Sequence, residues 1–172
     1  MMNFQYSQAR LSIKFLVTWF LMLVGISYVF GLINIYNNTG FSFTGVVVHY
    51  RGAVGEELPL EFAFSKLIHE HHVHLFSISM LFFLVGLLFA FTNLPEKIKV
   101  VCISMPFVGM ALDFASFWLM VFQSPLFAWI AMVFGSLMAI SFFLLLGRPL
   151  YEMWLLPLFL KITNNQLPWF LK

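Results

Sequence analysis

Residues 73–92 read VHLFSISMLFFLVGLLFAFT, a stretch without Asp, Glu, Lys or Arg. A helix needs about 20 consecutive apolar residues to cross a hydrocarbon core about 30 Å thick. Three further stretches meet this requirement, at 15–36, 100–122 and 126–147. The sequence therefore predicts an all-α integral membrane protein, a bundle of four transmembrane helices that run alternately up and down.

Composition excludes several other classes of protein. Of the 172 residues, 62% are hydrophobic and 9% are charged, whereas soluble proteins carry about 25% charged residues. The net charge of +2 and the lack of a basic cluster among the aromatic residues argue against nucleic-acid binding. The single cysteine, Cys102, excludes an internal disulfide, a paired-cysteine redox site and covalent haem attachment through two cysteines.

Basic residues are distributed unevenly between the two sides of the predicted bundle. Arg51 and Lys66 fall on one side, and the other side carries Arg10, Lys14, Lys97, Lys99, Arg148, Lys161 and Lys172. By the positive-inside rule, both termini are cytoplasmic, while residues 37–72 form a long external loop and 123–125 an external turn. The first apolar stretch is longer than the core of a secretory signal, which predicts a retained signal anchor.

The chain divides into a transmembrane domain, 1–147, and a cytoplasmic interfacial tail, 148–172. Glu152, Pro157 and Lys161 interrupt the apolar pattern of the tail, and Trp154 and Trp169 are expected at headgroup depth. Small residues at helical spacing predict close helix contacts inside one chain in preference to oligomerisation, at Gly86, Ala90, Ala131, Gly135 and Ala139.

The histidines gather on the predicted external side of the protein, at His49, His69, His71, His72 and His74. Neutral imidazole is the commonest protein ligand for transition metals and also binds haem iron. If residues 69–74 are helical, rotation by about 100° per residue separates His72 from His74. One face then carries Glu70, His71, His74 and Ser77, and the other carries His69, His72 and Phe76. If the helix instead begins near Val73, several imidazoles can converge.

We therefore expect an outward-facing metal or haem site. The candidate cofactor ligands are His49, His72 and His74, with Arg51 placed to neutralise a haem propionate, and a metal ion would also draw on His71 and Glu70. A second axial ligand for haem would come from His49, from Met120 or from another chain. The competing interpretation is a solvated or interfacial run of imidazoles with no shared ligand, and an internal ion pair of Arg51 with Glu56, Glu57 or Glu61.

Asp113 is the sole acidic residue inside a predicted span. A carboxylate in the membrane costs a few kcal/mol or more unless it is paired or protonated, and it is a functional-site candidate by default. We expect Asp113 to handle protons or to bind a quinol headgroup, as part of a polar thread through Ser116, Ser77, Ser79 and His74. The alternative is a neutral, hydrogen-bonded Asp that fixes helix packing. Glycines at 45, 52 and 55 predict turns that fold the loop over this region.

Three short segments carry a resemblance: His49-Tyr50-Arg51-Gly52, residues 72–76 (HVHLF) and residues 113–118 (DFASFW). In this order and with four spans, they resemble an uncharacterised family of small bacterial inner-membrane proteins, some of which carry an elongation-factor label. The resemblance covers about residues 10–147, and the chain departs from the family pattern at His71, where Thr is expected, and at His69. It implies a multi-pass protein of the bacterial inner membrane and points to His49, Arg51, His72, His74 and Asp113 as the site. It implies no activity.

Two functions follow as hypotheses. The first is a membrane redox or metal-binding subunit, with haem b or, alternatively, copper, that passes electrons between the quinone pool and an external cytochrome. The second is a non-catalytic subunit that anchors or assembles a larger membrane complex, with no cofactor. A small transporter lacks the expected inverted repeat, and an enzyme acting alone lacks a nucleophile and base at one depth.

Overall fold

The computed structural model describes residues 6, 9–53 and 55–160. Its elements are α1 (Leu11–Thr39), α2 (Phe43–Arg51), β1 (Gly52–Ala53), β2 (Glu56–Glu57), α3 (Leu60–Ala90), α4 (Glu96–Phe122), α5 (Phe127–Leu150) and the π-helical turn η2 (Tyr151–Leu155). The described residues contain four helices that are long and apolar enough to cross a membrane. The predicted all-α membrane bundle is therefore confirmed, and the protein is a multi-pass membrane protein in contact with the lipid bilayer.

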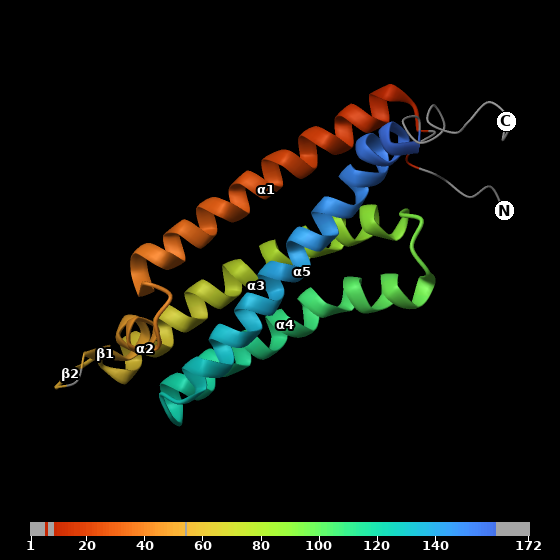
Figure 1. Ribbon diagram of the computed structural model, residues 1–172. Helices are drawn as coiled ribbons and strands as arrows, with labels where there is room; N and C mark the ends of the chain where they lie inside the picture. The colour runs from red at the N-terminus through yellow and green to blue at the C-terminus, as the bar shows by residue number, and fades with distance from the viewer. Residues whose placement is uncertain (1–5, 7–8, 54, 161–172) are drawn as a thin grey trace, which may run out of the picture.

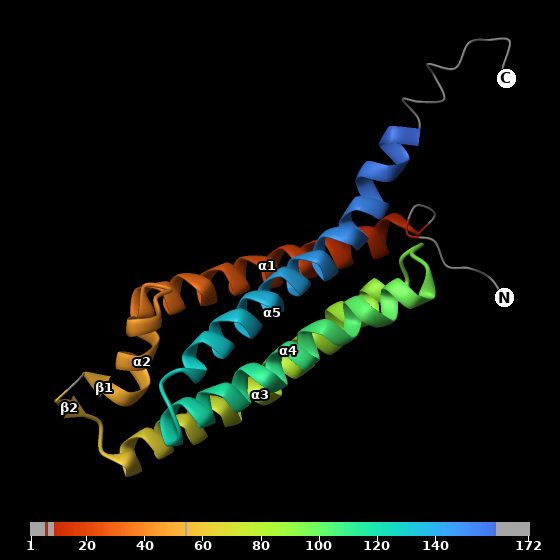
Figure 2. The same ribbon diagram turned by 60° about the horizontal axis from the view of Figure 1, so that its bottom comes forward.

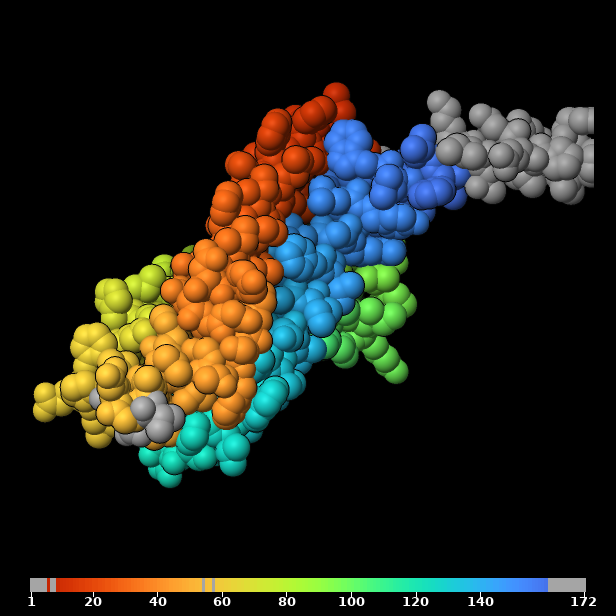
Figure 3. All heavy atoms as spheres, turned by 60° about the vertical axis from the view of Figure 1, so that its left-hand side comes forward, coloured from red at the N-terminus to blue at the C-terminus, as the bar shows by residue number. Residues whose placement is uncertain are grey.

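The helices form a three-helix core with a fourth helix on its outside. α5 packs against both α3 and α4, and α1 runs alongside α5 (Figures 1 and 2). Figure 3 shows α1 and α5 side by side on the face that α2 also borders. The start of α1, the α3–α4 connection and the end of α5 lie at one end, which we call the Glu152 end. α2, the hairpin and the α4–α5 turn lie at the other, the α2 end (Figure 1).

Two apolar clusters hold the bundle together. The cluster at the α2 end is Val46, Ala63, Leu67, Met120, Val121 and Ala128. The other cluster joins all four long helices and extends to the Glu152 end, and its buried members include Leu21, Phe82, Val85, Met110, Phe142 and Leu145. Small residues serve contacts within the chain, as predicted: Ala131 is buried, and a Cβ on Gly86 would lie 3.4 Å from Ile103.

The prediction of one long external loop at 37–72 is wrong. This segment forms the end of α1, then α2, a two-stranded hairpin and the first turns of α3. Pro59 precedes α3, Glu61 lies in its first turn, and Ala63 and Leu67 are buried one turn apart. These features are the usual helix-start and amphipathic signals. The sequence analysis did not predict this helix, because residues 60–72 contain charged side chains and a hydropathy criterion for spans excludes such a segment.

α2 folds back sharply on α1 through a short left-handed connection. Gly40 and Phe41 adopt positive φ of 60° and 50°, and Ser42 caps α2 by accepting a hydrogen bond of 3.0 Å from the amide of Gly45. A Cβ on Gly45 would lie 1.8 Å from the carbonyl oxygen of Thr39. Gly45 is therefore required for close approach inside α2, and not for the turn that we predicted there.

The C-terminal segment also differs from the prediction. α5 contains Pro149 and continues through η2 to residue 160 as one helix, with no break at 148. The π-helical turn, which locally displaces the hydrogen-bond ladder, begins two residues after Pro149. Trp154 donates a hydrogen bond of 2.9 Å to the Thr18 hydroxyl and so ties this helix to α1. The rest of the tail, with Lys161, Trp169 and Lys172, lies outside the described residues.

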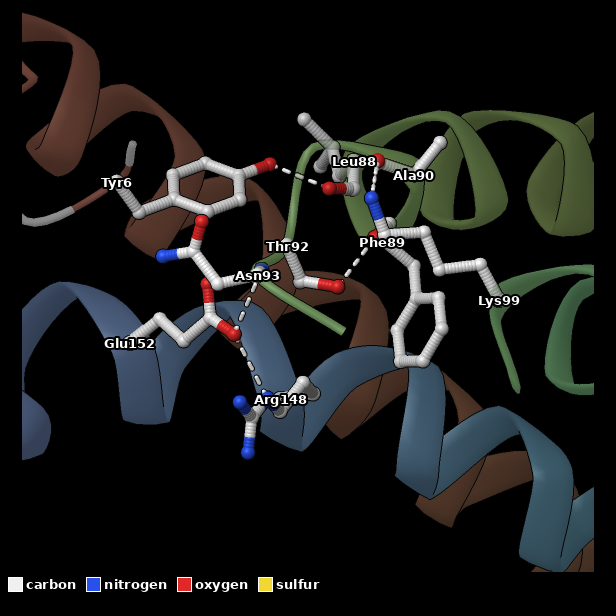
Figure 4. A network of polar contacts seen from close by, with 9 residues as sticks. All are labelled: Tyr6, Leu88, Phe89, Ala90, Thr92, Asn93, Lys99, Arg148 and Glu152. Atoms are coloured by element: carbon white, nitrogen blue, oxygen red, sulfur yellow. Dashed lines mark hydrogen bonds and ion pairs between the residues drawn. The ribbon is translucent and has the colours of Figure 1, made fainter. Parts of the chain in front are cut away.

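The Glu152 carboxylate is fully buried at the end of the bundle that bears its name. Both of its oxygens lie 3.0 Å from the backbone N–H of Asn93, and the Arg148 Nε–H donates to one of them at 2.8 Å (Figure 4). The contacts link η2 to the α3–α4 connection. Sequence reasoning treated Glu152 only as an interruption of the apolar pattern, and it missed this role.

Three side chains from different segments satisfy the last carbonyls of α3 beside this carboxylate. Tyr6 donates to Leu88, Thr92 donates to Phe89 at 2.7 Å, and Lys99 donates to Ala90 at 2.8 Å (Figure 4). Burial and then the charge of Glu152 raise the pKa of Tyr6, so that its hydroxyl stays a donor. A helix end without such partners would leave carbonyls unsatisfied in an apolar environment.

Candidate functional site

Residues 69–74 lie well inside α3, and their side chains therefore point in different directions. His69, His72 and His74 are exposed, whereas Glu70 and His71 are half-buried and face the rest of the bundle. Of the two alternatives for residues 69–74, the structure has the helical one, because α3 begins at Leu60 and not near Val73. Among the described residues, no three His, Cys, Asp or Glu side chains are placed to hold one metal ion.

His71 packs between aromatic side chains of α4. Trp118 donates its indole N–H to His71 Nδ1 at 2.8 Å, and the imidazole stacks on Phe114 with centroids 4.4 Å apart. Because Nδ1 accepts a hydrogen bond, the neutral ring carries its proton on Nε2. Neither nitrogen is then free to ligate a metal in this arrangement.

Tyr50 of α2 reaches across to α3. Its hydroxyl donates to Glu70 Oε2 at 2.9 Å, and its ring lies against Phe117 of α4. Burial raises the pKa of Tyr50, and the charge of Glu70, the hydrogen bond to it and the charge of Asp113 raise this pKa further. Tyr50 is therefore a protonated donor that holds the Glu70 carboxylate.

Lys66 joins the same contact region. Its ammonium donates to the His49 carbonyl at 2.8 Å and lies 3.0 Å from His49 Nε2, and it also lies 4.9 Å from the centre of the Tyr50 ring. An ammonium has donors only, so that His49 Nε2 is the acceptor. We call His49, Tyr50, Lys66 and Glu70 the outer cluster.

We expect His49 to make the stability of the protein depend on pH. Burial lowers the pKa of His49, Lys66 lowers it further, and Glu70 partly opposes them. As the pH falls below the ordinary value of 6.5, the unfolded chain binds a proton that folded His49 resists, and the free energy of unfolding decreases. Thermal unfolding in detergent should show a smaller loss on acidification for His49→Gln than for the unchanged protein. Equal losses would contradict this assignment.

Arg51 follows the outer cluster at the end of α2. Its guanidinium donates to the carbonyl of Met120 at 3.4 Å. Met120 itself is fully buried in the apolar cluster at the α2 end, and its surroundings there are apolar side chains. The structure therefore does not bring Met120 and an imidazole to the two sides of one site.

Asp113 lies deeper in the bundle, on the face of α4 that meets α5. It is 7% exposed, and a Cβ on Gly135 would lie 3.5 Å from its Oδ1. None of the described residues donates a hydrogen bond to this carboxyl. When the carboxyl is ionised, its charge contributes to the raised pKa of Tyr50, after burial and the effects of Glu70. Asp113 is thus a largely buried carboxyl next to a small residue, and among the described residues its oxygens have accessible surface instead of a hydrogen-bond donor.

The predicted serine thread does not form in the structure. Ser116 donates to the carbonyl of Leu112 at 2.6 Å, and Ser77 donates to that of Val73 at 2.8 Å. These bonds stay inside each serine's own helix, where membrane serines commonly satisfy themselves. Ser79 contacts the sulfur of Met110 at 3.9 Å. The polar groups on which the Asp113 charge acts are the tyrosines Tyr50 and Tyr28, and not the serines.

Sequence reasoning overlooked three residues of this site although signals for them were present. Tyr50 and Trp118 belong to the segments that carried the family resemblance, and Lys66 precedes Glu70 by one helical turn. Such a spacing is typical of side chains that share a helix face. The predicted roles of His49, Arg51, His72, His74 and Asp113 as cofactor or proton sites stay predictions.

Comparison with known proteins concerns the part of the chain that follows α1. Residues 40–158 match a family described as a transmembrane helical domain. The match begins where α1 ends and runs through α2, the three-helix core and η2, so that it contains the outer cluster, Asp113 and Glu152. No curated protein and no solved structure matches the chain. Because the match covers more than half of its length, the chain belongs to this family of transmembrane helical domains.

Proposed function

We propose that this protein is the proton-handling subunit of a redox complex in a bacterial inner membrane. The observation that carries the proposal is the Asp113 carboxyl, which lies in a membrane-spanning helix, is only 7% exposed and receives no hydrogen bond from the described residues. A carboxylate in that environment costs several kcal/mol, and the binding of a proton removes this cost. A group in this position is suited to take up and release protons.

The outer cluster supplies the route between Asp113 and the α2 end. Tyr50 donates a hydrogen bond of 2.9 Å to Glu70, and the charge of an ionised Asp113 acts on Tyr50. Towards the Glu152 end, Asp113 is followed by the apolar cluster that includes Phe82, Val85 and Phe142. Protons should therefore exchange with the α2 end, which the distribution of basic residues predicts to be periplasmic.

The redox part of the proposal is supported by the imidazoles at the same end. His49 and His71 make other contacts, which leaves the exposed rings of His72 and His74 as candidate ligands for haem b or copper. A second ligand would then come from another chain, and Arg51, whose guanidinium lies at the same end of the bundle and contacts the Met120 carbonyl at 3.4 Å, would meet an acidic group of the ligand. Bound haem b would supply one-electron transfer between the quinone pool and an external cytochrome.

The proton-handling role can be tested by infrared spectroscopy of the protein in lipid nanodiscs. We expect a carbonyl band from a protonated carboxylic acid that shifts in deuterated buffer and is absent in Asp113→Asn. Tyr50→Phe should slow the shift by about tenfold, the change that an added barrier of about 1.4 kcal/mol produces. The matched controls are Glu96→Gln, whose carboxylate is 82% exposed, and Tyr36→Phe, whose ring is exposed; neither should alter the band or its exchange.

The two parts of the proposal fail separately. A band unchanged by Asp113→Asn, or exchange unaffected by Tyr50→Phe, would contradict proton handling through the outer cluster. Purified protein that is colourless and free of iron and copper by elemental analysis would contradict the redox part and favour an anchoring subunit. In that case a stoichiometric partner should stay bound when His72 and His74 are both replaced by Ala.

A further inference from the structure

An open apolar groove runs between α1 and α5. Its volume is about 560 Å³, and side chains of both helices line it, among them Leu21 and Ile33 of α1 and Phe143 and Leu150 of α5. The exposed surface of a single helix is convex, whereas this surface is concave because two helices build it. One apolar chain can therefore contact the protein on two sides here.

Two glycines give the groove its depth. A Cβ on Gly25 of α1 would lie 3.8 Å from Leu146 of α5, so that the two helices come close together there. Gly147 of α5 is exposed, and a Cβ on it would meet none of the described residues within 4 Å. A side chain at this position would thus project into the open groove.

The length of the groove matches one lipid leaflet. Leu21 and Ile33 mark its two ends on α1, and a rise of about 1.5 Å per residue separates them by about 18 Å. Half of a hydrocarbon core about 30 Å thick is about 15 Å. An acyl chain that enters from the Glu152 end would therefore lie in the groove along its whole extent.

Aromatic side chains close the groove at the Glu152 end. Thr18 and Trp154 lie about one turn beyond it on their two helices, and the indole N–H donates to the Thr18 hydroxyl at 2.9 Å. Phe15 contacts the Trp154 ring edge-on, with centroids 5.7 Å apart, and the Lys14 ammonium lies 5.9 Å from the centre of the same ring. Trp is typical of headgroup depth, so that Lys14 is placed beside lipid headgroups.

The charge at this end is suited to an anionic headgroup. Lys14 lies about 10 Å beyond Leu21 along α1, Arg10 precedes the helix and is exposed, and the first turn of α1 contains no acidic residue. The carboxylate of Glu152 is buried and bound by Arg148, so that it does not cancel these charges. Basic residues beside transmembrane helices on the cytoplasmic side commonly bind acidic lipid headgroups, and the distribution of basic residues predicts that this end is cytoplasmic.

We propose that the groove between α1 and α5 binds one anionic phospholipid of the leaflet at the Glu152 end. One acyl chain lies in the groove against Gly147, and the phosphate lies beside Lys14 and Arg10. The lipid fills space between α1 and the three-helix core that side chains leave open. The site does not depend on the proton route, because neither Asp113 nor the outer cluster lines the groove.

Native mass spectrometry of the full chain in detergent tests the headgroup, with phosphatidylglycerol and phosphatidylcholine of identical acyl chains as probes. We expect one phosphatidylglycerol to stay bound per chain and phosphatidylcholine to bind more weakly. Lys14→Gln should weaken phosphatidylglycerol binding about fivefold, the loss expected for one basic residue at a membrane surface. Lys97→Gln removes an exposed cation of α4 at the same end, and it should leave binding unchanged.

Gly147→Leu tests the groove, because the new side chain should displace the acyl chain and release the lipid. Gly31→Leu is the matched control, since a Cβ on Gly31 also meets none of the described residues within 4 Å but Gly31 does not line the groove. Ile26→Trp fills the same groove from α1 and should act like Gly147→Leu, so that the test stays decisive if one variant does not fold.

Three results would overturn the proposal: phosphatidylcholine held as firmly as phosphatidylglycerol, lipid retained when the groove is filled, or equal losses in Lys14→Gln and Lys97→Gln. A quinone bound in place of the phospholipid would also contradict it.

Discussion

In a Gly45→Ala variant, we expect α2 to detach from the end of α1 and the outer cluster to come apart. The added methyl group would lie 1.8 Å from the carbonyl oxygen of Thr39, and this neighbour is backbone, which cannot rotate away. Overpacking of this kind costs about 1–3 kcal/mol or more. Movement of α2 would also break the contacts of Tyr50 with Glu70 and of His49 with Lys66. Hydrogen exchange of α2 amides should accelerate strongly.

Gly31 provides a matched control in the same region of sequence. It is also a helical glycine, but a Cβ there would meet nothing within 4 Å. Gly31→Ala should therefore be neutral or stabilising by about 0.5–1 kcal/mol, since alanine loses less entropy on helix formation. If both variants unfold at the same temperature and protect α2 equally, Gly45 is not the residue that allows α2 to pack on α1.

A Glu152→Ala variant should lose most of the organisation of the Glu152 end. The substitution removes the acceptor of the Asn93 N–H and leaves Arg148 without its partner at 2.8 Å. Breaking a buried ion pair from one side costs about 3–5 kcal/mol, because the remaining polar groups stay desolvated. We expect a large fall in the thermal unfolding temperature in detergent and faster exchange at the α3–α4 connection, with α2 much less affected.

Two substitutions show whether charge and burial cause this effect. Glu152→Gln keeps an acceptor oxygen and should recover part of the loss, since Arg148 and Asn93 retain a hydrogen-bond partner. Glu96→Ala removes a carboxylate that is 82% exposed and 3.9 Å from Lys99, and such exposed pairs contribute at most about 1 kcal/mol. A Glu152→Ala protein as stable as Glu96→Ala would show that the buried carboxylate does not hold this end together.

The limits of sequence reasoning are clearest in α3. Its apolar half, 73–92, was recognised because twenty uncharged residues satisfy the thickness of a bilayer. The half that carries Lys66, Glu70, His69, His71 and His72 was assigned to a loop, because charged residues lower the hydropathy on which a span is recognised. The apolar residues of this half, including Ala63 and Leu67, recur at helical spacing in the sequence. Only the structure shows what buries them, which is α2 and α4.

The candidate site was found in part for a similar reason. Asp113 stands out in any sequence because a carboxyl among apolar residues is costly in lipid. Its relation to Tyr50 is not visible in this way, since 63 positions separate the two residues and their coupling depends on how α2 folds over the bundle. The burial of Glu152 was not predicted, because it depends on hydrogen bonds from the Asn93 N–H and the Arg148 guanidinium. The Asn93 contact exists only when the α3–α4 connection packs against η2.

By itself, the sequence determined the class of the protein and the number of its spans. These properties follow from the transfer of each segment between water and lipid, which is a local quantity. Only the tertiary structure decided which imidazoles are engaged, where α2 lies and what surrounds Asp113 and Glu152. These features depend on distances between segments that are remote in the chain. Packing and hydrogen-bond geometry set such distances, and the hydropathy of a segment contains no information about them.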